Sequence, residues 1–212
     1  MFAELGKVAK VLIDSIAKIK NITDKRKYRQ SCIDVISVYY VLKDIRDDAV
    51  KLLNACNWNP NEKISTLSEL ELSAFLCFCD EILRKQGERL YCLERKINSD
   101  QCLAFMDDEL HRKLLEAIGH KSQRVVSLHG IASTLVIEAM LPSETPEDRV
   151  ELIQRMSGLE NDTLNLNEIR QEIDNFSLLL KQYKNYSVSL VDNPELVEIT
   201  ELAKSNAMLG RV

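Results

Sequence analysis

The sequence predicts an all-α protein, and three observations support this fold class. The chain of 212 residues has only six glycines and four prolines, too few for the many turns of a β-rich fold. Apolar residues recur every three or four positions in at least five long segments. Helix-boundary signals separate these segments. We therefore expect a bundle of four long helices, then a short helix, a coiled-coil-like long helix and a C-terminal helix.

The four long helices are expected at residues 2–20, 25–57, 66–97 and 99–141. Pro60 lacks an amide hydrogen and should end the second helix, which would be about 50 Å long. Thr66, with Glu69 three residues later, forms a plausible capping box for the third. The first half of that helix is apolar on more than one face, which predicts that other helices surround it. Pro142 ends the fourth helix.

The remaining chain predicts three further helices. Thr145 and Pro146 begin a short helix that ends at Gly158, and Asn193 begins the last helix, which reaches residue 208. The helix between them has the most regular repeat and predicts a coiled-coil-like seam. We call these residues the helix seam: Leu166, Ile169, Ile173, Phe176, Leu180 and Tyr183. We expect residues 1–141 to form the bundle and residues 142–212 a helical brace that packs on it or extends from it.

Composition limits the protein class and the compartment. Apolar residues make up 45% of the chain, which is enough for a substantial core. No apolar run reaches about 18 residues without a charge, and no secretory signal is recognisable, so we expect a cytoplasmic protein without a transmembrane segment. The six cysteines fall mostly on apolar helical positions and are expected to be free thiols.

The charge distribution identifies a candidate binding arm. The net charge is −5, yet residues 1–30 hold eight basic and three acidic side chains. The first helix is amphipathic, and in outline it resembles the N-terminal helix of HeLo-type membrane-disrupting domains, which implies a membrane-active bundle. The arm could instead contact phosphates of nucleic acid or an acidic protein, or be an ordinary solvated helix face. The candidate partner- or phosphate-binding residues are Lys18, Lys20, Lys25, Arg26, Lys27 and Arg29.

Metal and cofactor sites are not expected. Asp108 and His111 have the acid-x-x-His spacing of di-iron bundles, but this motif occurs only once. Cys77 and Cys79 would diverge by about 200° on a helix, which prevents chelation. The glycines are scattered singly, so a phosphate-binding loop is excluded.

One motif points to catalysis. Arg124 precedes His129 by five residues, and this spacing resembles the Arg-x4–6-His signature of the HEPN family of small helical ribonucleases. The resemblance implies that Arg124 would hold the scissile phosphate and that His129 would act as a general acid or base. It covers six residues and the helical class.

The interpretation that we favour is a non-enzymatic scaffold or accessory subunit of a protein complex. It would bind protein partners, or its own copy, through long helix faces. The second helix is longer than a globular domain of this size is wide, since the expected radius of gyration is about 17 Å. The ribonuclease and the membrane-active bundle are the two alternatives.

Overall fold

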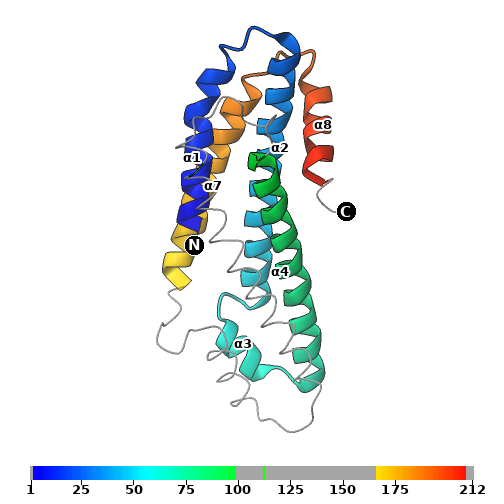
Figure 1. The fold of residues 1–212 in the computed structure, drawn as a ribbon. Helices are drawn as coiled ribbons and strands as arrows, with labels where there is room; N and C mark the ends of the chain where they lie inside the picture. The colour runs from blue at the N-terminus through cyan, green and yellow to red at the C-terminus, as the bar shows by residue number, and fades with distance from the viewer. Residues whose placement is uncertain (1, 99–111, 113–165, 209–212) are drawn as a thin grey trace. The chain divides into compact units, whose positions relative to one another are not determined.

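The computed structural model describes residues 2–98, 112 and 166–208 (Figure 1). Within these residues the chain forms six helices and no strand, so the predicted all-α class is confirmed. The helices are α1 (Phe2–Ile19), α2 (Lys25–Ala55), α3 (Pro60–Thr66), α4 (Glu69–Asn98), α7 (Leu166–Val188) and α8 (Leu196–Met208). The predicted helices over 99–141 and 145–158, and the predicted boundary after residue 141, lie outside the described residues.

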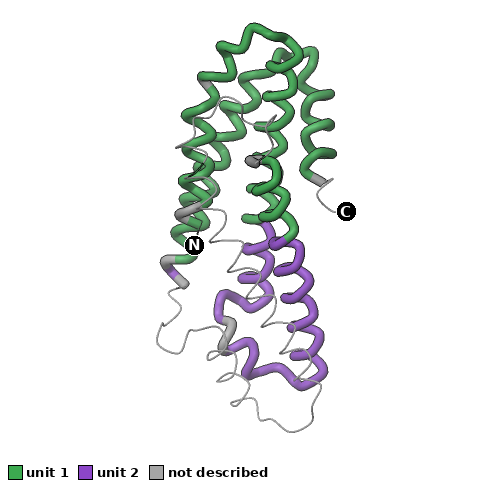
Figure 2. Tube along the Cα trace, in the orientation of Figure 1, with its two compact units in different colours: residues 1–46, 88–122, 169–212 green, residues 47–87, 123–168 purple. Residues whose placement is uncertain are grey.

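The chain divides into two units (Figure 2). In its described part, unit 1 contains α1, the first part of α2 up to residue 46, the end of α4 from residue 88, most of α7, and α8. The described part of unit 2 is residues 47–87, which include the end of α2, all of α3 and the first part of α4, together with residues 166–168 at the start of α7. The long helices α2 and α4 therefore contribute residues to both units.

The core of unit 1 forms around the first turns of α2. Every residue from 32 to 38 is buried, including the polar Asp34 and Ser37. The apolar face of α1 is also buried, and its Phe2 ring lies 5.6 Å from the ring of Phe176 in α7. The backbone amide of Phe2 donates a hydrogen bond to the Glu172 carboxylate at 2.6 Å. Segments about 170 residues apart in sequence thus form one core.

The connection between α2 and α4 differs from the prediction. Asn57 and Trp58 both take positive φ angles, 51° and 60°, and end α2. Pro60 then occupies the first turn of α3, where its missing amide hydrogen costs nothing, and Asn59 caps that helix. The prediction treated Pro60 only as a terminator, and so it missed α3.

The start of α4 is also corrected. The predicted capping box of Thr66 and Glu69 was wrong, because Thr66 is the last residue of α3. Ser68 caps α4 instead, and both its backbone amide and its hydroxyl donate to the Glu71 carboxylate, at 3.0 and 2.6 Å. The bond from the Ser68 amide is the glutamate half of a capping box, two residues later than predicted.

Candidate functional site

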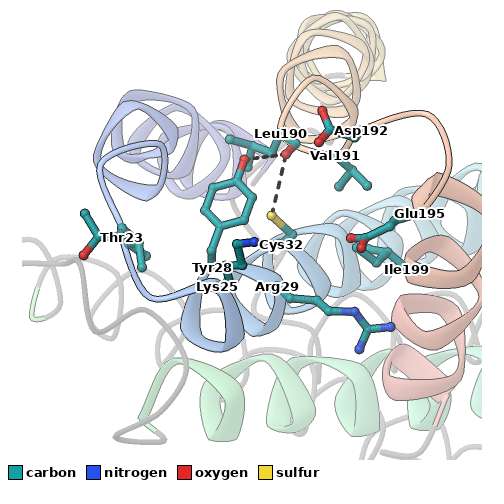
Figure 3. Close-up of a pocket in the computed structure, with 11 residues that line it drawn as sticks. Thr23, Lys25, Tyr28, Arg29, Cys32, Leu190, Val191, Asp192, Glu195 and Ile199 are labelled. Atoms are coloured by element: carbon teal, nitrogen blue, oxygen red, sulfur yellow. Dashed lines mark hydrogen bonds between the residues drawn. The ribbon is translucent and has the colours of Figure 1, made fainter.

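A cavity of about 520 Å³ lies in unit 1, where the α1–α2 turn meets the α7–α8 turn (Figure 3). The α2 side contributes Tyr28 and Cys32 to its wall, and the other side contributes the end of α7 and the start of α8. The full lining is Ile22, Thr23, Lys25, Tyr28, Arg29, Cys32, Leu190, Val191, Asp192, Glu195 and Ile199.

Hydrogen bonds to one carbonyl hold the two turns together. The Tyr28 hydroxyl donates to the Leu190 carbonyl at 2.5 Å, and the Cys32 thiol lies 4.0 Å from the same oxygen (Figure 3). This carbonyl lies just beyond the C-terminal end of α7, where carbonyls lack a partner within the helix. Burial raises the pKa of Tyr28 and raises that of Cys32 to about 11. Since a protonated thiol is a poor nucleophile, we assign Cys32 a structural role.

The charges around this cavity balance. Lys25 and Arg29 come from α2, whereas Asp192 and Glu195 come from the opposite turn. The Arg29 guanidinium also bonds to the Glu198 carboxylate of α8 at 2.5 Å, in an exposed ion pair. Of the six predicted basic residues, Arg29 is therefore paired with a carboxylate of the same chain, and Lys25 shares the cavity lining with Asp192 and Glu195. Because these carboxylates offset the two basic side chains, the cavity lacks the positive charge that a phosphate site needs.

The other four residues of the basic arm lie on the surface. Lys18 is in the last turn of α1, and Lys20 follows that helix. Arg26 and Lys27 are exposed in the first turn of α2, which holds no acid. Their backbone amides donate to the Asp24 carboxylate at 2.9 and 3.0 Å. The bond from Lys27 is the main cause that lowers the pKa of Asp24.

The helix seam of α7 packs inside unit 1. Ile173, Phe176, Leu180 and Tyr183 are buried, and Ile169 is half-buried. The Tyr183 hydroxyl donates to the backbone carbonyl of Val35 in α2 at 2.8 Å, in a fully buried position. Leu166 begins α7. The surface formed by the helix seam is thus covered by other helices of the same chain.

The outward face of α7 still carries apolar area. Leu178 is 63% exposed and Tyr186 is 51% exposed, two helical turns further along. Gln182 lies between the two on this face, so they do not form a continuous apolar surface.

A continuous exposed apolar surface lies on α4 in unit 2. Leu70 is 82% exposed and Phe78 is 40% exposed, and Ala74 and Cys77 between them are exposed as well. Spacings of four and three residues place all four on one helix face. We call these four residues the α4 stripe. The sequence signal was visible as an apolar excess on more than one face, but the prediction that other helices surround this segment was wrong for Leu70 and Phe78.

The remaining predicted site residues lie outside the described residues. Arg124, His129, Asp108 and His111 are all outside them. Among the described residues, no group of three or more His, Cys, Asp and Glu side chains is placed to hold a metal ion. None of the described helices has the length and apolar character needed to cross a membrane.

Comparisons with protein families, with curated proteins and with solved structures find no match for this chain.

Proposed function

We propose that this chain is a non-enzymatic interaction subunit, which binds another protein chain through exposed helix faces and chiefly through the α4 stripe. The observation that carries the proposal is the exposure of Leu70 and Phe78 on one face of a long helix. Exposed apolar residues are common singly, but a contiguous apolar patch on a folded protein marks a binding surface.

The composition of the stripe favours a protein partner. Glu71, at the border of this face, is the only charged residue between Leu70 and Phe78 in the sequence, and depletion of charge is the property that distinguishes the centre of a protein interface. Covering Leu70 alone would contribute on the order of 2 kcal/mol, because fully burying a leucine yields about 1.5–3 kcal/mol. Charged residues, including Glu71 and Arg84, border the stripe as an interface rim.

Unit 1 offers weaker support for the membrane-active alternative. The apolar face of α1, which would enter the lipid, is buried against the chain itself, with Leu5, Leu12 and Ile19 each at 0% exposure. Insertion of α1 would require breaking the core around Phe2 and Phe176. We therefore favour the interpretation that α1 is a core helix with a solvated basic face.

Cross-linking in cells that express the tagged chain tests the proposal. We expect the wild type to form a specific cross-linked complex that Phe78→Glu abolishes, since the new carboxylate would have to be buried in the interface. Leu178→Glu, on the exposed face of α7, is the matched control and should leave the complex intact. The proposal fails if Phe78→Glu leaves the complexes unchanged, or if the wild type forms none.

A further inference from the structure

The borders of the α4 stripe are complementary to themselves. Glu71, Phe78 and Lys85 are spaced by seven residues, so they follow one border of the stripe in the order acid, aromatic, base. Leu70, Cys77 and Arg84 follow the other border with the same spacing. All lie in unit 2 and in a single helix. If a second, identical helix runs in the opposite direction and is centred on Phe78, its Lys85 lies opposite Glu71 of the first helix.

We propose that the partner of the α4 stripe is a second copy of this chain, bound antiparallel about a two-fold axis that passes beside Cys77 and Phe78. This inference rests on the proposed function and names the occupant of the same surface. In an antiparallel pair, equivalent borders of the two helices face each other, so Glu71 of one copy lies opposite Lys85 of the other, twice per dimer. Phe78 meets Phe78 of the second copy, and Cys77 meets its own counterpart.

The charges also select the antiparallel direction. A parallel pair in register would instead set each border against the other border, so Lys85 would lie near Arg84 of the second copy and Glu71 would face no base. Like charges at neighbouring helix positions are destabilising. In the antiparallel pair, the aliphatic stem of Arg84 covers Leu70 of the other copy. Ala74, a small residue, lies opposite Glu81, whose carboxylate already bonds to Lys85 of its own helix.

The contact is short, so the dimer should be weak and dependent on concentration. The stripe spans residues 70–78, little more than one heptad, and Glu81 interrupts the apolar row beyond Phe78. Sedimentation equilibrium up to about 100 µM covers the dissociation constants expected of such a small, transient interface.

A charge swap tests the pairing directly. Glu71→Lys and Lys85→Glu should each weaken self-association about tenfold, because each replaces two attractions with two repulsions. Mixing the two single variants should restore association between unlike copies, since all facing pairs are then of opposite charge. The double variant should restore self-association. Restoration in neither case would overturn the proposal.

Cysteine cross-linking provides an independent readout. Oxidation by diamide should join two Cys77 thiols in a disulfide while the diamide is reduced to the hydrazine, and this yields a covalent dimer that Cys77→Ser does not form. A wild type that stays monomeric at every concentration overturns the proposal. If such a monomer still forms a complex that Phe78→Glu abolishes, the proposed function stands and only the identity of the partner was wrong.

Discussion

Replacing Tyr183 with phenylalanine isolates one buried hydrogen bond between α7 and α2. The Tyr183 side chain is fully buried, and its hydroxyl donates to the Val35 carbonyl at 2.8 Å. Tyr183→Phe keeps the ring, which lies 6.2 Å from the ring of Tyr39, and removes only the hydroxyl. Because that carbonyl also accepts the helical amide of α2, we expect a loss of about 1 kcal/mol in the free energy of unfolding.

Urea denaturation followed by circular dichroism measures this loss. Tyr183→Ala also removes the ring and should cost about 3–5 kcal/mol, as large-to-small core substitutions do. Tyr186→Phe is the matched control, because this tyrosine is 51% exposed on the same helix, and it should change stability by less than about 0.5 kcal/mol. If Tyr183→Phe proves as harmless as Tyr186→Phe, the buried bond between α7 and α2 does not stabilise the fold.

Three further predictions concern other parts of the chain. Burial raises the pKa of Cys32 to about 11 and that of Cys79 to about 12. The two protonated thiols contribute fully to the free energy of unfolding below pH 9, and this contribution is lost as the pH rises through the folded-state pKa values. The free energy of unfolding should therefore fall less between pH 8 and pH 10 in the double variant with Cys32→Ala and Cys79→Ala than in the wild type. A wild type equally stable at pH 8 and pH 10 would contradict this. Asn57 has a φ of 51°, so Asn57→Val should lower the free energy of unfolding by about 1–2 kcal/mol whereas Asn57→Gly should not, and equal midpoints for the two variants in urea would show that the turn is not strained. An interaction subunit should leave RNA intact, as should its Arg124→Ala and His129→Ala variants; cleavage by the wild type that either substitution abolishes would favour the ribonuclease.

Local patterns in the sequence predicted the helices well. The periodic apolar segments placed α1, α2, α7 and α8 within a few residues of their observed ends. The errors arose where one residue type serves two purposes. Pro60 can stop a helix or begin one, and Thr66 and Ser68 are equally good caps on paper. Which one acts depends on where the preceding chain ends, and that depends on the left-handed turn at Asn57 and Trp58.

The candidate sites were harder to predict, because they depend on contacts between distant segments. Tyr28 and Leu190 are 162 residues apart, and neither belongs to a motif that would bring them together. An apolar helix face also looks the same in sequence whether its own chain or a partner covers it. The first half of α4 was therefore predicted to be surrounded by helices, but Leu70 and Phe78 are exposed. The regular repeat of α7, by contrast, is buried within its own chain.

The contact between Phe2 and Phe176 has a consequence for the time course of synthesis. At about 5–20 residues per second, a ribosome needs roughly 7 to 30 s to advance from the end of α1 to the start of α7. During that interval the apolar face of α1 cannot yet contact α7. The nascent protein must keep α1 in solution, or on a chaperone, until α7 has been made.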